Sequence, residues 1–460
     1  MSERLMVTNP FSGELLGEFD YDSFEQQQDK VKRLRAAAAT WRQVPLTERI
    51  KLVRQGMEYF EQHRSKIALD ITNQMGRPLH QADGEINGFF ERGNYLCSIA
   101  HETLAPDQLT DKPGLDRAIH HTPMGVIYVI AAWNYPLLIA VNSVVPALIA
   151  GNTILFKHSS ITPKIGAHFQ KAFSCLGENR DLLLNSITSH TTTLQVIEQL
   201  PVDHVVFTGS VSGGRKIATA CASRFITPGL ELGGKDGVYV HSDADLEAAV
   251  ASVVDGAMFN SGQSCCGVER LYLHQDIYDQ FIQQAQKLLT EYRLGDPCQS
   301  SSSVGPLAKG NSADYMLQQV QQAVSLGAKI LTGGKIKKIA QGIFFEPTLM
   351  VGVDHQMEVM QEENFGPILP VMKVESLDQA IRLVNDSPYG LTSAIFTKNQ
   401  MLAQEFADRV DAGTIFMNRC DYLDPALPWS GVKDSGAGSS LSKYGFYHLT
   451  QRKALHFKQG

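Results

Sequence analysis

From Gly125 to residue 232, short apolar runs alternate with segments of helical character, and this order is the strongest constraint on the fold. Strands that alternate with helices form βαβ units, in which the strands run parallel and helices cover both faces of the sheet. The sequence therefore predicts an α/β fold. The expected strands are VIYVIAA, TILFK, LLLNSI, HVVFTG and ITPGLEL, and the expected helices cover 136–150, 161–177, 190–200 and 213–223.

A second α/β run begins near Gly237, whereas the first hundred residues have a mainly helical pattern. The second run has a helix over Ala244–Met258 and the strands GVYVHS, ERLYLHQ, KILTGG, FFEPTLMVG, PILPVMKV, SAIFTK and GTIFMN. The N-terminal helices are expected over Asp22–Val44 and Thr47–Gly76, each opened by a capping residue, and over Gln81–His101. The C-terminal RKALHFK is predicted to be an edge strand, which needs a partner.

Composition excludes several classes of function. The 460-residue chain has 41 basic and 48 acidic residues, a net charge of −7, and no basic run of the kind that binds nucleic acid. At about 150 residues per domain, this length predicts about three structural units. The seven cysteines follow no disulfide or zinc-site spacing, which favours a reducing compartment and predicts no metal. The N-terminus lacks an apolar signal core, so we expect a cytoplasmic protein.

The segment Gly125–Gly151 is long and apolar enough to resemble a membrane span. Polar residues and prolines interrupt it at Asn134, Pro136, Asn142 and Pro146. We interpret it as a buried strand over 126–132 followed by a buried helix with Pro136 near its start, where a missing N–H costs little. No membrane association is expected.

Phe207–Gly214, FTGSVSGG, joins a predicted strand to a predicted helix. Glycines at such a turn let the backbone approach a pyrophosphate, and the helix N-terminus favours its negative charge. The spacing is not GxGxxG, and a structural turn explains the motif equally well. Lys157 ends the strand TILFK at the sheet edge where ligands of α/β proteins bind, although a surface lysine is the simpler interpretation.

Phe259–Arg270, FNSGQSCCGVER, places two adjacent cysteines in a polar loop. Structural cysteines usually lie singly in apolar surroundings, whereas a thiol in a polar loop can ionise near cations or helix dipoles. Two incidental core cysteines are the alternative interpretation of this segment. Glu231 ends an apolar strand; a glutamate that points into the interior has a raised pKa and suits a general base, whereas a surface carboxylate there would only cap the strand end. Asn134, between a buried strand and helix, is either a structural cap or a donor to an oxyanion.

The motifs WNYP, FTGS, LELGGK, GQSC with an arginine five residues on, and EENFGP occur in this order. With them, the chain resembles the aldehyde dehydrogenase superfamily from about Asn9 to its C-terminus. The resemblance implies that Cys265 attacks the aldehyde, that Glu231 activates water to release the acid from the thioester, and that Asn134 and the Cys265 N–H hold the oxyanion. It places Trp133, Lys157, Ser160, Gly209, Ser210, Gly214, Leu232, Glu363 and Phe365 around NAD or NADP.

The resemblance also implies three domains. A Rossmann-like cofactor domain would cover 1–104 and 123–232, an α/β catalytic domain 233–440, and a small oligomerisation β-sheet 105–122 with 441–460. Such an arrangement predicts a homodimer or homotetramer.

Two departures from the family pattern affect the expected chemistry. Many members have a glutamate at the position of Ser160, which repels the 2′-phosphate of NADP; serine permits NADP. Ser439 and Ser440 replace a common Arg-Glu pair, so a second carboxylate relay is absent and Glu231 is expected to act alone.

The expected substrate pocket matches no subfamily closely. Succinate semialdehyde dehydrogenases usually have an arginine at the position of Asn142, whereas Trp429 is shared with betaine and aminoaldehyde members. Aromatic faces attract cations, and Asp421 and Asp424 would add negative potential, so the sequence favours a cationic aldehyde such as betaine aldehyde. A succinate semialdehyde or general aliphatic pocket is the alternative. The pocket residues expected are Tyr135, Asn142, Phe259, Ser264, Asp421 and Trp429.

Other classes of protein are disfavoured. A coenzyme-A-acylating enzyme would not need Glu231 as a base. A non-catalytic relative would be expected to lose Cys265, Glu231 or Asn134, and all three are present. A cysteine hydrolase would need a histidine base, and none of the 14 histidines lies in a motif for one.

Overall fold

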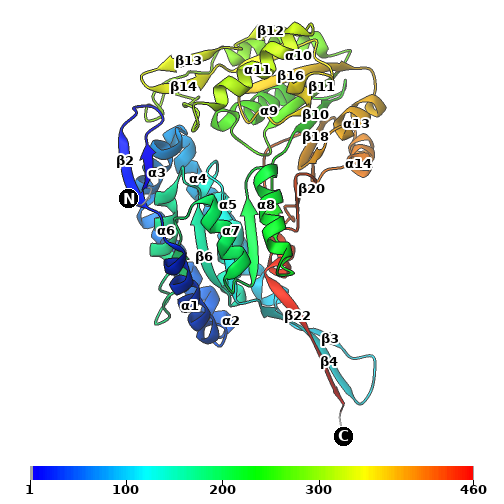
Figure 1. Cartoon of the computed structure of the whole chain (residues 1–460). Helices are drawn as coiled ribbons and strands as arrows, with labels where there is room; N and C mark the ends of the chain where they lie inside the picture. Colours follow the sequence, from blue (N-terminus) through cyan, green and yellow to red (C-terminus); the bar gives the residue numbers. More distant parts are fainter. Residues whose placement is uncertain (1–3, 459–460) are drawn as a thin grey trace.

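The computed structural model describes residues 4–458 and contains two large, mainly parallel sheets (Figure 1). The first sheet has the order β21-β9-β8-β5-β6-β7, in which β5 to β9 run parallel and β21 is antiparallel. Its strands are β5 Val126–Ala131, β6 Thr153–His158, β7 Leu183–Asn185, β8 His204–Thr208, β9 Gly229–Glu231 and β21 Gly436–Ala437.

The second sheet has the order β12-β15-β16-β11-β10-β18-β19, with only the β12–β15 pair antiparallel. Its strands are β10 Asp236–Val240, β11 Val268–His274, β12 Lys329–Thr332, β15 Thr348–Val351, β16 Ile368–Val374, β18 Thr392–Phe396 and β19 Thr414–Met417. Two short pairs accompany it: β13 Ile336–Ile339 with β14 Gly342–Phe345, and β17 Tyr389–Gly390 with β20 Val432–Lys433. The predicted α/β class is confirmed.

Helices cover both sheets, and α5 (Pro136–Ala150) lies almost entirely in the core of the first. Pro136 begins α5, and Gly151 ends it in the left-handed conformation (φ 98°). Among residues 4–458, no helix combines the length and apolar character that crossing a bilayer requires. The helices around the first sheet are α1 Phe24–Trp41, α2 Leu46–Gln62, α3 Arg64–Met75, α4 Leu79–Thr103, α6 Pro163–Phe173, α7 His190–Gln199, α8 Val211–Ala222 and α15 Ser442–His448.

The second sheet carries the remaining helices. They are α9 Leu246–Met258, followed directly by the 3-10 turn η1 Phe259–Gly262, then α10 Tyr278–Leu289, α11 Ser312–Ser325, α12 Glu358–Gln361, α13 Leu377–Asn385 and α14 Gln400–Arg409.

A third sheet projects from the body as an arm (Figure 1). It consists of β22 (Thr450–Lys458), β4 (Leu115–Pro123) and β3 (Asp107–Leu109), and β22 pairs with all nine residues of β4. The C-terminal segment is therefore an outer strand of this sheet, as predicted. The domain boundaries and the oligomeric role of the arm remain predictions.

Three local predictions were wrong. The segment after Thr47 forms two helices, because the backbone leaves helical geometry at His63 (φ −116°, ψ 18°), and α2 begins at Leu46 without a side-chain cap. FFEPTLMVG is two strands in different sheets, because Pro347, which has no N–H to donate, separates β14 from β15. The start of the chain also contains a hairpin of β1 (Arg4–Thr8) and β2 (Leu15–Asp20).

Candidate active site

Parallel strands bring the motif residues to one edge of the first sheet. Trp133 and Asn134 follow β5, Lys157 is the penultimate residue of β6, Gly209 follows β8 and Glu231 ends β9. Since β5, β6, β8 and β9 are parallel neighbours, their carboxyl ends meet, which is where ligands of α/β sheets bind. Motif residues that are far apart in the sequence therefore lie close together in the structure.

The loop before the adjacent cysteines has a constrained backbone. Asn260, Ser261 and Gly262 all have left-handed φ angles, of 53°, 57° and 70°. A methyl group on Gly262 would lie 2.1 Å from the carbonyl carbon of Gly366, so only glycine fits there. The surrounding structure must hold this conformation, since non-glycine residues pay for it.

Cys265 and Cys266 have different environments. Cys266 is buried and its thiol donates to Asp421 Oδ1 over 2.9 Å. The hydrogen bond from Cys265, burial and the nearby Asp421 raise the pKa of Cys266 well above its ordinary value. Cys265 is partly exposed. Because the thiolate is the nucleophile, Cys265 is the thiol available for reaction.

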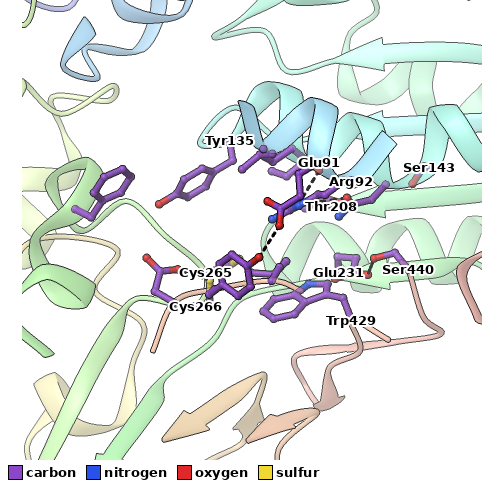
Figure 2. A pocket seen from close by; sticks show the side chains of 18 of the residues that line it. Glu91, Arg92, Tyr135, Ser143, Thr208, Glu231, Cys265, Cys266, Trp429 and Ser440 are labelled. Atoms are coloured by element: carbon purple, nitrogen blue, oxygen red, sulfur yellow. Dashed lines mark hydrogen bonds between the residues drawn. The ribbon is translucent and has the colours of Figure 1, made fainter. Parts of the chain in front are cut away.

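Two cavities meet at Cys265. One has a volume of about 400 Å³ and is lined by residues of α4, α5 and the segment 421–429 (Figure 2). The other, of about 520 Å³, extends over the carboxyl edge of the first sheet. Thr208, Leu232 and Cys265 line both cavities. A carbon bonded to the Cys265 sulfur can therefore face molecules in either cavity.

Glu231 is held by a segment from the far end of the chain. β21 pairs with β9, and Ser440 forms a two-way backbone bridge with Trp429. Ser440 donates its hydroxyl to Glu231 Oε1 over 2.8 Å, and Figure 2 shows the two side chains together. The other carboxylate oxygen, Oε2, is buried and has no partner among residues 4–458. Burial raises the pKa of Glu231 to about 7, which suits a general base near neutral pH.

Asn134 lies on a buried polar network that the sequence analysis missed. Arg77 pairs with Glu85 and donates to the backbone oxygen of Asn134, while Glu85 Oε1 accepts the Leu137 and Leu138 N–H groups at the start of α5. The Asn134 amide donates to Gln263 O over 3.3 Å and lines the larger cavity with Cys265. No acceptor bonds the Cys265 N–H within residues 4–458. Both groups therefore belong to residues that line the larger cavity beside the Cys265 thiol.

Arg92 is a second residue that the sequence analysis missed, because it belongs to no motif. It lies on α4, lines the smaller cavity and is only 7% exposed (Figure 2). Its Nη1 donates to Leu138 O and Asn142 Oδ1 over 3.1 and 3.3 Å. No carboxylate forms a salt bridge with it among the described residues, and burial lowers its pKa. Its other nitrogens have no acceptor within residues 4–458.

The larger cavity contains nearly all residues expected around a dinucleotide. Lys157 is 7% exposed, not a surface lysine, and burial lowers its pKa to about 8. Gly214 does not line the cavity; a methyl group there would lie 2.5 Å from Leu232 Cδ2, so this glycine allows α8 to approach the sheet. The expected residues that do line it are Trp133, Lys157, Ser160, Gly209, Ser210, Leu232, Glu363 and Phe365.

The α8 end of this cavity can accept a negative charge. Ser210 caps the N-terminus of α8 by accepting the Gly213 N–H over 3.2 Å, and both residues line the cavity. Lys216 also lines it. A helix N-terminus with a nearby cation suits a phosphate, so these residues fit a nucleotide cofactor.

The smaller cavity contains most of the expected substrate residues. Tyr135, Asn142, Phe259, Asp421 and Trp429 line it. Ser264 does not; it is buried, with its hydroxyl 3.5 Å from Cys266 Sγ.

Comparisons with known proteins agree with this geometry. The model of the aldehyde dehydrogenase family matches residues 1–455. A succinate-semialdehyde dehydrogenase [NADP(+)] of Deinococcus radiodurans is 32% identical over 98% of this chain and 95% of its own length. The structure of lactaldehyde dehydrogenase from Escherichia coli matches with a TM-score of 0.95 and 30% identity, over 100% of this chain and 96% of that one. A 3,6-anhydro-L-galactose dehydrogenase in complex with NAP matches with a TM-score of 0.93 and 30% identity, over 99% and 96%.

Proposed function

The chain belongs to the aldehyde dehydrogenase family, and we propose that this enzyme oxidises a short aldehyde that carries a carboxylate at its far end. Members of the family are NAD- or NADP-dependent oxidoreductases that convert an aldehyde to a carboxylic acid. The substrate class is inferred from Arg92 in the smaller cavity.

The roles proposed for the catalytic residues follow from their positions. Cys265 adds to the aldehyde carbon from the point where the cavities meet, and the Asn134 amide and the Cys265 N–H stabilise the oxyanion. Lys157, Ser210 and Glu363 of the larger cavity would hold NAD or NADP, which would supply the hydride acceptor, so that the adduct on Cys265 would become a thioester. Glu231 then takes a proton from water, and hydroxide addition releases the acid.

Arg92 is the observation that carries the substrate proposal. A buried guanidinium without a carboxylate partner is costly, and a substrate carboxylate would remove that cost. Arginine also binds carboxylates through two parallel hydrogen bonds. Asn142 occupies the position at which succinate semialdehyde dehydrogenases usually have an arginine, and it accepts a hydrogen bond from Arg92. Arg92, on α4, thus supplies the positive charge that an arginine at the position of Asn142, on α5, would supply in those enzymes. The relative named as a succinate-semialdehyde dehydrogenase supports this choice.

The cationic aldehyde favoured by the sequence is the second candidate. Asp421, Trp429, Phe259 and Tyr135 do line the cavity. However, Arg77 already lies 4.4 Å from the centre of the Tyr135 ring, and Asp421 accepts the Cys266 thiol, with burial raising its pKa to about 7. The attraction that these groups offer a cation is therefore reduced.

Steady-state kinetics on matched aldehydes test the choice. We expect kcat/KM for succinate semialdehyde to exceed that for butanal, and that for betaine aldehyde to be lowest. Arg92→Met should lower kcat/KM for succinate semialdehyde about 100-fold, since a hydrogen-bonded charge pair contributes about 2–3 kcal/mol, and should leave butanal nearly unchanged. Higher kcat/KM for betaine aldehyde than for succinate semialdehyde would refute the proposal.

We also propose that the enzyme accepts NADP. Ser160 lines the cofactor cavity where a glutamate would repel a 2′-phosphate. The NADP complex of a 30% identical structure supports this proposal. The β22 edge (Figure 1) leads us to propose a homodimer or homotetramer as well, which light scattering of the purified enzyme would test.

A further inference from the structure

A third, much smaller cavity adjoins Glu231 and is lined by residues of α5, β9 and α15. It has a volume of about 10 Å³, which is close to the space that one water molecule needs. Its polar lining includes Glu231, Ser143, Ser439, Ser440 and His448. A water there would have several polar partners.

Two of these residues carry buried polar atoms without partners. Glu231 Oε2 and His448 Nε2 are both inaccessible to solvent, and neither bonds any atom among residues 4–458. Buried polar atoms are nearly always hydrogen-bonded to protein or to ordered water. A water molecule in the shared cavity would satisfy both atoms.

The His448 ring is held in a specific seat. Methyl groups built on Gly229 and Gly438 would lie 2.5 Å and 2.6 Å from ring atoms, so only glycines leave room for it. Gly438 has a φ of 89°, and Nε2 is the ring atom closest to Gly229. Gly229 also lines the small cavity, which places Nε2 on that side.

The other side of His448 reaches the surface. His448 lines an open hollow of about 470 Å³, together with His204 and Tyr447. Nδ1 of His448 makes no hydrogen bond within residues 4–458. Unlike Nε2, it is accessible to solvent. His448 therefore lines both the small cavity and the open hollow, and Nε2 is its buried, unpartnered nitrogen.

We propose that His448 is a proton-relay residue for thioester hydrolysis. The proposal rests on the proposed role of Glu231 as the base. Water attacks the thioester carbon and gives its proton to Glu231. The protonated carboxyl passes that proton through the cavity water to His448 Nε2, and the resulting imidazolium releases its Nδ1 proton to solvent. Proton exchange with water then returns the ring to the tautomer with a free Nε2 before the next turnover. Glu231 is then a carboxylate again, and the acid and the Cys265 thiolate are the products.

The relay acts after hydride transfer, and this timing separates it from a structural role. In His448→Phe, which keeps a ring in the seat, we expect kcat to fall about tenfold. The first turnover should still give one equivalent of NAD(P)H per site at the wild-type rate, seen as a burst in stopped-flow absorbance. The solvent deuterium isotope effect on kcat should increase.

Tyr447→Phe is the matched control, because Tyr447 lines the same hollow but not the small cavity, and its ring packs against His121 and Tyr444. It should keep the wild-type kcat and isotope effect. His448→Ala opens the seat, so added imidazole should restore its kcat with saturation, whereas it should not restore His448→Phe.

Three results would overturn the relay: wild-type kcat and isotope effect in His448→Phe, loss of the burst itself in that variant, or failure of imidazole to restore folded His448→Ala. Absence of NAD(P)H formation by the wild-type enzyme with every aldehyde would overturn the proposed function instead.

Discussion

Ser440→Ala should move the pH dependence of thioester hydrolysis to higher pH. The Ser440 hydroxyl donates to Glu231 Oε1 over 2.8 Å and stabilises the ionised carboxylate, which lowers its pKa. Burial acts in the opposite direction and is larger, so the pKa of Glu231 is raised to about 7. Removing the hydroxyl leaves burial less opposed, and the pKa of Glu231 should rise further.

The size of the change follows from the free energy of that hydrogen bond. A hydrogen bond to a charged group contributes about 1.5–3 kcal/mol, and one pH unit corresponds to about 1.4 kcal/mol. The pKa of Glu231 should therefore rise by about one to two pH units. Only the carboxylate can take a proton from water, so hydrolysis falls as pH drops below the pKa. At pH 7 the ionised fraction would fall from about one half to about one tenth or less, and the two enzymes should converge only near pH 10.

The assay must isolate hydrolysis from hydride transfer. p-Nitrophenyl acetate acylates the same cysteine without an oxidation step and releases p-nitrophenolate as a burst. The rate of the steady phase after that burst, measured from pH 5.5 to 10 at constant ionic strength, reports release of the acyl group. Ser430→Ala is the matched control, because Ser430 shares a hydrogen bond with Ser439 over 2.6 Å and lines neither the substrate cavity nor the small cavity beside Glu231. If the pH at which the hydrolysis rate of Ser440→Ala falls to half were the same as in the wild-type enzyme, or lower, the reasoning would be refuted.

Four further outcomes are expected. Asn134→Ala should lower kcat about 100- to 1,000-fold with little change in KM in steady-state assays, because one oxyanion donor is lost. Cys266→Ala should keep most activity in the same assay, whereas Cys265→Ala should have none. Arg77→Met should lower the free energy of unfolding by about 3–5 kcal/mol in urea titrations, because its buried carboxylate partner loses its counter-ion. Ser160→Glu should lower kcat/KM with NADP more than with NAD, and equal losses would contradict the proposed contact.

The sequence predicted the parts of the site that depend on local pattern and strand order. Pro136 and Gly151 mark the two ends of α5 because each has a backbone requirement that a helix terminus satisfies. The residues after β5, β6, β8 and β9 could be expected to meet because consecutive parallel strands end at one edge.

The remaining features depend on contacts between distant segments. Nothing in the helical pattern of α4 indicates that Arg92 lines a cavity, since charged residues on helices usually face water. From the sequence, Ser440 was noted only because it replaces the glutamate that is common at this position, and no contact with Glu231 was predicted. Its contact with Glu231 depends on the bridge to Trp429 and on the pairing of β21 with β9. In that pairing, Gly436 lies opposite Glu231, which is 205 residues earlier in the chain. The break at His63 likewise occurs within a continuous helical pattern.

The two cavities that meet at Cys265 take most of their walls from different parts of the chain. α4, α5 and the segment 421–429 line the aldehyde side, whereas the ends of β5, β6 and β8 and the start of α8 line the nucleotide side. Substitutions can therefore change which aldehyde is accepted without altering nucleotide affinity. In a scaffold divided in this way, the preferred aldehyde can change during evolution while the nucleotide cofactor stays the same. The variety of aldehydes named among relatives that share about 30% of their residues with this chain is what such independence would produce.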